Sequence, residues 1–155
     1  MHARIISLVA LGLLLGYSGR SPGAADEATE REAKKLQGTW EIVSQEVDGT
    51  VMPKSHFQDT RVLFKGEEFK TEVKGKVVAE GTFNLVGVRG NVVEVDEITA
   101  SAGRNTTGTT PAIYEWVNED TFRWCQPVEK GKRPTEFTAR KGSRQEMLEY
   151  RRVGR

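Results

Sequence analysis

Turn signals recur about every ten residues from Gly38 onward in this 155-residue chain, and short runs of strand-forming residues lie between them. Asp48-Gly49 is the clearest signal, because this dipeptide is typical of a two-residue β-hairpin. No helical pattern interrupts the series, so consecutive strands are expected to pair as an antiparallel meander. The other turns are expected at Gly66-Glu67, at Gly75-Lys76 and at residues 87–90, 118–120 and 141–144.

About eight or nine strands are predicted, and we expect them to close into an all-β barrel. Residues 68–74 alternate cleanly, with Phe69, Thr71 and Val73 on one face and charged residues on the other. Gly81 falls in mid-strand and indicates a bulge or a bend. An open meander of this length would leave two exposed edges, which favours closure. The predicted strands are residues 40–47, 61–65, 68–74, 77–86, 91–99, 112–117, 121–126, 135–140 and 146–152, with loops at 51–60, across one barrel mouth, and at 100–110.

The step Gly38-Thr39-Trp40 marks the start of the first strand. Before it, residues 26–37 are polar, with acidic side chains first and basic side chains last, an order that suits the dipole of a short helix. Gly38 is expected to end this helix. Trp40 is expected to close one end of the barrel, where the last strand, from residue 147 to 152, covers it.

The N-terminus has the pattern of an export signal. Arg4 supplies a basic start, residues 5–17 are mostly apolar, and small residues precede an expected cleavage after Ala25. The apolar stretch is shorter than the roughly 20 residues of a membrane span, and Arg20 stands where a lipid-modified cysteine would be needed. We therefore expect a signal peptide over 1–25, the short helix over 26–37 and one barrel domain over 38–153. The mature protein would be periplasmic or extracellular, with no lipid anchor and no membrane span.

The charge balance argues against a nucleic-acid partner. The chain has 23 basic and 22 acidic residues, and removal of Arg4 and Arg20 with the signal leaves 21 basic against 22 acidic. A near-neutral domain has no electrostatic footprint for nucleic acid or for an anionic membrane surface. The single cysteine, Cys125, fits either a protein that is stable without disulfides or an intermolecular partner. We expect a monomer.

Each candidate chemical site has a structural explanation that we favour. Cys125 has only His56 as a base in the mature chain, so a structural thiol is favoured over a nucleophile. A metal site at His56 would need carboxylates from distant loops. Glu94, Asp96 and Glu97 could serve acid–base chemistry, but alternation separates Glu97 from the other two, and a solvated strand face is favoured. Serine-nucleophile and phosphate-loop motifs are absent. The sequence predicts no enzyme activity, no cofactor and no metal.

Several segments together resemble a known family. They are Leu36-Gln37-Gly38-Thr39-Trp40, Leu63-Phe64-Lys65-Gly66, Ala79-Glu80-Gly81, Ile113-Tyr114-Glu115, Arg133-Pro134-Thr135-Glu136-Phe137 and Tyr150-Arg151-Arg152. This set resembles the lipocalin-like domain of unknown function that recurs in planctomycete bacteria, and residues 91–108 depart from its pattern. The resemblance implies a calycin-like barrel and structural roles for Gly38, Trp40, Arg133 and Pro134. It also implies that Arg151 or Arg152 packs on Trp40, and alternation favours Arg152.

Two classes of function stay open. The first is a carrier or sensor that binds a small apolar ligand in the barrel, with Phe83, Tyr114, Trp116, Phe122, Trp124 and Phe137 as its walls. The second is a ligand-free module that acts through its surface, as an envelope interaction protein or a secreted-protease inhibitor. An eight-stranded barrel either fills with its own side chains or holds one small ligand. The number of large aromatic side chains favours a narrow or filled interior.

Overall fold

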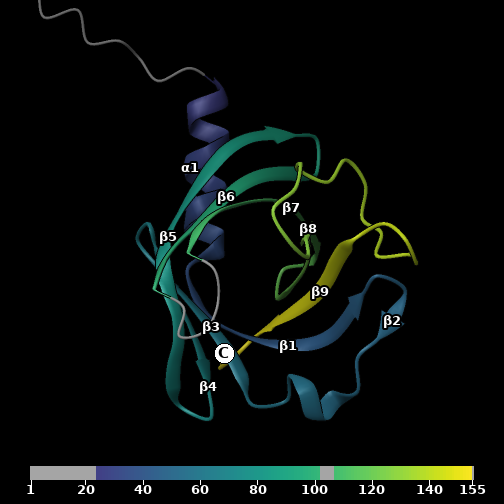
Figure 1. Ribbon diagram of the computed structural model, residues 1–155. Coiled ribbons are helices and arrows are strands. Elements are labelled where there is room, and N and C mark those ends of the chain that lie inside the picture. The colour runs from purple at the N-terminus through teal and green to yellow at the C-terminus, as the bar shows by residue number, and fades with distance from the viewer. Residues whose placement is uncertain (1–23, 102–106, 155) are drawn as a thin grey trace, which may run out of the picture.

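The computed structural model describes residues 24–101 and 107–154. Most of the predicted signal peptide lies outside this part of the chain. The strands curve round a central space, and the helix lies behind β5 and β6 in Figure 1. The elements are α1 (Ala24–Leu36), β1 (Gly38–Val47), β2 (Thr50–Val51), the 3-10 helix η1 (Lys54–His56), β3 (Thr60–Lys65), β4 (Glu68–Val73), β5 (Lys76–Arg89), β6 (Val92–Ser101), β7 (Gly108–Asn118), β8 (Thr121–Pro127) and β9 (Gln145–Arg152).

The strands form one antiparallel sheet in the order β2-β1-β3-β4-β5-β6-β7-β8-β9. Strand β9 also pairs with β1, with Trp40 opposite Arg152 and Ile42 opposite Tyr150. Eight strands therefore close a barrel, and the short β2 is an extra strand at the end of β1. This arrangement confirms the predicted all-β barrel with one short helix. Within the described residues, no helix combines the length and apolar character that crossing a membrane requires.

Two of the glycine signals have the structural effect that the sequence predicts. Asp48 and Gly49 both have positive φ, 47° and 83°, as a tight hairpin turn requires. At Gly81 the pairing register shifts between β5 and β6, which is the predicted bulge. A Cβ atom at Gly81 would collide with the carbonyl oxygen of Ile98. A residue without a side chain therefore lets the two strands approach at this point.

Three segments of the chain differ from the predicted secondary structure. The strand predicted at 135–140 is wrong, because β9 occupies the edges of both β8 and β1 and leaves no edge for another strand. The turn predicted at 87–90 is shorter: β5 continues to Arg89, and Gly87 lies at a register shift within the strand. The loop predicted at 100–110 is partly strand, since β6 ends at Ser101 and β7 begins at Gly108. Residues 102–106 lie outside the described part.

Helix α1 and the end of β9 close one end of the barrel around Trp40. The Trp40 ring is fully buried and donates a hydrogen bond from Nε1 to the carbonyl of Leu36, at 2.8 Å. The guanidinium of Arg152 lies 4.1 Å from the ring centroid of Trp40. Arg152 also donates to the carbonyls of Gln37 and Lys35, at 2.7 and 2.8 Å. The pairing predicted for Trp40 and Arg152 is therefore present and ties the helix, the first strand and the last strand together.

The loop between β8 and β9 is held to the outside of the barrel by Arg133. Its Nη1 donates to the carbonyls of Val95 and Ala112, both at 2.6 Å, and its Nη2 pairs with Asp96 at 2.6 Å. The neighbouring Pro134 is buried. Arg133 thus caps carbonyls and pairs with a carboxylate across β6 and β7, which is a structural role.

Candidate ligand-binding site

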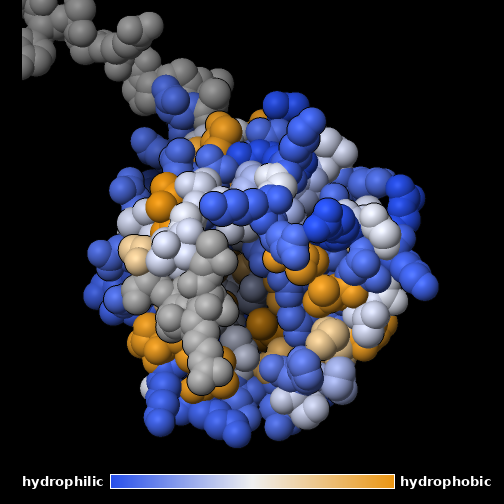
Figure 2. Space-filling model, in the orientation of Figure 1, coloured by the Kyte–Doolittle hydropathy of each residue, from blue (hydrophilic) through white to orange (hydrophobic). Residues whose placement is uncertain are grey.

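A cavity of about 730 Å³ lies at the end of the barrel away from α1. The ends of β6 and β8 and the start of β7 contribute its walls, whereas Trp40 and α1 lie near the opposite ends of these strands. Figure 2 shows the molecule hollowed near the middle of one face, with apolar surface inside the hollow. The lining residues are Ala79, Glu97, Thr99, Thr107, Gly108, Thr109, Thr110, Pro111, Gln126, Pro127, Val128, Glu129 and Lys130.

Towards the closed end, aromatic rings fill the interior. Trp40 and Phe122 meet edge to face with centroids 4.7 Å apart, and Phe122 stacks on Tyr150 at 4.9 Å. Tyr114 stacks on Trp124 at 6.0 Å. Trp40, Phe122, Tyr114 and Trp124 are each at most 2% exposed. This half of the barrel therefore offers little surface to a ligand, as the aromatic content of the sequence led us to expect.

A polar network lies inside the barrel between the aromatic half and the cavity. Glu146 on β9 accepts hydrogen bonds from Gln45 Nε2 at 2.6 Å and from Gln126 Nε2 at 2.9 Å, one on each carboxylate oxygen. The side-chain oxygen of Gln126 in turn accepts from Trp124 Nε1 at 2.8 Å. The strand registers explain the cluster, because Gln126 pairs with Glu146 across β8 and β9. The network fixes Glu146 with both oxygens bonded to neutral amide donors.

Glu97 on β6 is the second carboxyl group of this interior. Burial, and secondly the charge of Glu146, raises the pKa of Glu97 from an ordinary 4.5 to about 7. Burial also raises the pKa of Tyr150, with further contributions from Glu97 and Glu146. Within the described residues, no hydrogen bond or ion pair reaches the Glu97 carboxyl group. Near neutral pH this group therefore gains or loses a proton at the wall of the cavity.

The residues predicted as ligand walls have different surroundings in the structure. Phe83, Tyr114, Phe122 and Trp124 belong to the buried core. Trp116 packs against that core beneath α1, where its Nε1 donates to Glu32 at 2.6 Å. Phe137 is in the loop between β8 and β9 and not on a strand. None of these six residues lines the cavity described above.

Of the polar residues of the interior, Glu97 was considered from the sequence, and Gln45, Gln126 and Glu146 were not. Glu94 and Asp96 do lie on the outer face, where they pair with Arg89 at 3.2 Å and Arg133 at 2.6 Å. Glu97 lies on the opposite, inner face, so its assignment to a solvated strand face is wrong. Its alternation with Val93 and Val95, both buried, was the available signal.

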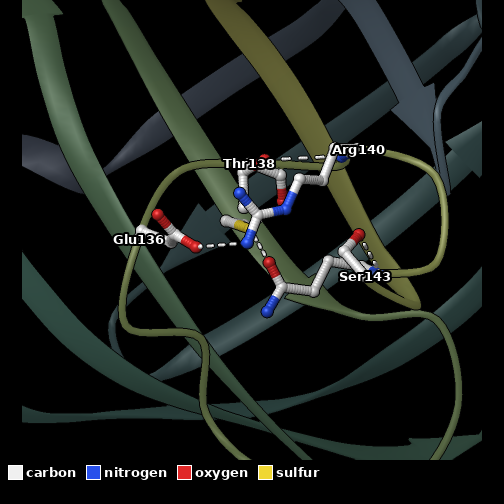
Figure 3. A network of polar contacts seen from close by, with 6 residues as sticks. Glu136, Thr138, Arg140 and Ser143 are labelled. Carbon is white, nitrogen blue, oxygen red and sulfur yellow. Dashed lines mark hydrogen bonds and ion pairs between the residues drawn. The ribbon is translucent and has the colours of Figure 1, made fainter.

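Cys125 lies on the outer face of β8, beneath the loop that joins β8 to β9. The thiol is buried, and its Sγ lies 3.5 Å from the carbonyl oxygen of Thr138 and 3.7 Å from Gln145 Oε1. Burial is the main cause that raises its pKa, which keeps it in the thiol form. Figure 3 shows the surrounding contacts, including the pair between Arg140 and Glu136 at 3.5 Å. The thiol is packed as a structural residue.

His56 does not belong to a metal site in the described part of the chain. It is exposed in the 3-10 helix η1. No group of three or more histidine, cysteine, aspartate or glutamate side chains in residues 24–101 and 107–154 could hold a metal ion. The interior carboxylates Glu97 and Glu146 are accordingly a pair without a third ligand of this kind.

A second cavity, of about 630 Å³, lies on the outside beside α1. Two of its cations already have anionic partners: Lys35 pairs with Glu32 at 3.1 Å, and Arg152 pairs with Asp120 at 3.2 Å. Arg152 is further committed to Trp40. The other residues that line this second cavity are Lys34, Trp116, Asn118 and Glu119. Arg152 and Trp116 donate to groups of the helix and hold it to the barrel, so the interior cavity is the stronger candidate for a ligand.

Comparison of the chain with protein-family models, with curated proteins and with solved structures gave no match. The resemblance to the planctomycete lipocalin-like domain therefore stays a prediction. The functional argument rests on the cavity and on the side chains that surround it.

Proposed function

We propose that this protein binds one small molecule inside the barrel, in the cavity at the end away from α1. The observation that carries the proposal is a cavity of about 730 Å³, lined mainly by polar side chains, with the apolar residues Ala79, Pro111, Pro127 and Val128 among them. Small-molecule sites typically have volumes of about 300–1,000 Å³. A barrel of eight strands has room for one such ligand.

The ligand we propose is amphiphilic and not purely apolar. The aromatic rings pack against one another and are nearly inaccessible, so they leave no apolar pocket at the closed end. The accessible walls combine apolar Ala79, Pro111 and Val128 with Glu97 and the amide of Gln126. A ligand with one polar group and a modest apolar body would satisfy both kinds of surface.

The wider role we propose is that of an exported, non-enzymatic carrier or sensor of the lipocalin-like kind. The signal-like N-terminus supports export to the periplasm or the outside. The closed barrel is compatible with such a binding domain. The alternative is a surface-acting interaction module or protease inhibitor, which would carry a bound polypeptide and no small molecule.

Native mass spectrometry of protein purified gently from cells expressing the full chain tests the binding proposal. We expect an added small-molecule mass that disappears on denaturation. Thr99→Phe should fill the cavity and remove the added mass, because Thr99 lines it. Ile98→Phe is the matched control, since Ile98 is 41% exposed and does not line the cavity. Bare protein in all three samples would contradict the proposal, and a co-purified polypeptide in its place would favour the surface-acting module.

A further inference from the structure

We infer that the interior cavity selects a ligand with a protonated amine, which enters first and lies against Glu97, with the charge of Glu146 behind it. This inference rests on the proposed function and adds the chemical class of the ligand to it. The apolar body of the amine would lie against the cavity walls nearer the mouth. Charge, hydrogen bonding and shape support the inference separately.

The charge of the interior is negative and uncompensated within the described residues. Glu97, Glu146 and Tyr150 are the ionisable groups of the polar interior. No ion pair joins either carboxylate to a lysine or arginine in residues 24–101 and 107–154. Among the described residues that line the cavity, Lys130 is the one lysine or arginine, and it is exposed beside the acidic Glu129. Carboxylates that are partly removed from water are stabilised by a counter-charge or a proton, and a ligand cation would supply the counter-charge.

The hydrogen-bonding capacity of the two carboxylates matches an ammonium group. Glu146 has one amide donor on each oxygen and retains further acceptor capacity. Glu97 is half-buried, lines the cavity, and has no donor among the described residues. An ammonium group has three donors and no acceptor, so it can donate to Glu97 at the cavity wall, and the negative charge of Glu146 close by favours the same cation. A carboxylate ligand would instead add a third negative charge.

The walls near the mouth favour an apolar body behind the amine. The lining includes the uncharged residues Ala79, Pro111, Pro127 and Val128 together with four threonines. Such a surface suits an aliphatic or small aromatic chain. A bare inorganic cation would leave these walls unused, and no cluster of three metal-ligating side chains that could hold calcium is found in residues 24–101 and 107–154.

The inference predicts a specific dependence on pH. The groups that face Glu97 are Glu146 and Tyr150 from β9 and the neutral Gln126 from β8, with Glu129 and Lys130 in the loop beside the mouth. An aliphatic amine stays protonated from pH 6 to pH 8, as a lysine does. Glu97 is mostly protonated at pH 6 and mostly ionised at pH 8, since its pKa is about 7. Amine affinity should therefore rise from pH 6 to pH 8.

Calorimetric titration with octylamine, octanol and octanoate tests the inference, because the three probes share one apolar body. With protein purified from cells expressing the full chain, we expect octylamine at pH 8 to bind about tenfold or more tighter than octanol, and octanoate to bind most weakly. Octylamine affinity should fall several-fold at pH 6, while octanol affinity should not change.

Glu97→Gln and Glu94→Gln separate the inner carboxylate from an outer one on the same strand. Glu97→Gln should remove most of the preference for octylamine, whereas Glu94→Gln should keep it, because Glu94 pairs with Arg89 outside the barrel. Equal binding of octylamine and octanol to the unmodified protein would overturn the inference and leave the proposed function standing. Calcium binding that displaces octylamine would also overturn it. If no probe binds at either pH while the native mass spectrum shows an added mass, the inference fails and the proposed function stands; if the native mass spectrum shows bare protein as well, the proposed function itself fails.

Discussion

At Glu97 a carboxyl group is held where its negative charge is unfavourable. Its pKa is raised to about 7 by burial and by Glu146, so the folded protein retains a proton there that the unfolded chain releases near pH 4.5. Stability from this group therefore falls as the pH rises from about 4.5 to 7 and is constant above that range. The cost at pH 8 is about 3 kcal/mol. A bound cation would offset it.

Replacing Glu97 with glutamine should raise the free energy of unfolding at pH 8 by about 1–3 kcal/mol, because the amide has the same shape without the charge. At pH 4.5 the two proteins should differ by less than about 0.5 kcal/mol, since Glu97 is then protonated in the folded state. Urea unfolding at the two pH values measures both differences. Glu94→Gln is the control, and a gain of equal size at both pH values would contradict the argument.

The contact between Trp40 and Arg152 is expected to make a large contribution to the stability of the fold. Trp40→Ala should cost about 3–5 kcal/mol, as expected for a fully buried aromatic ring. In a double-mutant cycle, the effects of Arg152→Ala and Trp40→Ala on the free energy of unfolding should be coupled by about 1–2 kcal/mol, because the guanidinium lies over the ring. Arg151→Ala should be additive with Trp40→Ala, since Arg151 pairs with Glu41 at the surface. Additive effects for Arg152 would mean that the stacking contributes no stability.

Strand parity explains which residues could be predicted from the sequence. The pairing of Trp40 with Arg152 follows from alternation along β9 together with the family resemblance. The same alternation places Glu97 with Val93 and Val95 inside the barrel. Acidic residues usually lie on solvated faces, and that general preference outweighed parity in the sequence analysis. The neutral amides of Gln45 and Gln126 stabilise the carboxylate of Glu146, which is 101 positions away from Gln45 and 20 positions away from Gln126 in sequence. No local pattern reveals these contacts.

At the scale of elements, the loop between β8 and β9 shows the limit of local patterns. Residues 135–140 have the composition of a strand, yet pairing requires a free edge, and β9 uses the edges of both neighbours. The loop instead packs on the outer face, where it buries Cys125 and where the amide of Gly49 donates to the carbonyl of Ala139. Long-range competition for edges decides this segment, and no short window of sequence contains that information.

Arg133 should be the main anchor of this loop. Arg133→Ala removes two hydrogen bonds to strand carbonyls and the ion pair with Asp96, and it should cost about 2–3 kcal/mol. Arg140→Ala is the matched control in the same loop, with an exposed pair to Glu136, and should cost less than about 0.5 kcal/mol. Denaturant melts compare the two variants. Similar small losses for both would show that the loop stays in place without Arg133.

For the whole molecule, the two ends of the barrel have different tasks. The closed end gathers α1, the aromatic rings and Arg152, and its contacts are those of a stable core. The other end keeps a cavity and a pair of carboxylates that no lysine or arginine of the described residues pairs with, which is unfavourable for stability alone. Proteins commonly accept such a local cost where a ligand binds. The closed end should therefore determine the stability of the fold, and the cavity end should determine ligand binding.

Hydrogen exchange with and without octylamine at pH 8 tests this separation. A ligand between the strand ends should slow amide exchange near Glu97, Thr110 and Gln126, because local opening at the mouth would require its release. Amides of β1 near Trp40 and of α1 should change much less, since they contact the filled half of the barrel. Octanoate serves as the control and should protect neither end. Uniform protection of both ends would mean that the barrel opens as one unit, and protection confined to α1 would move the binding site to the cavity beside the helix.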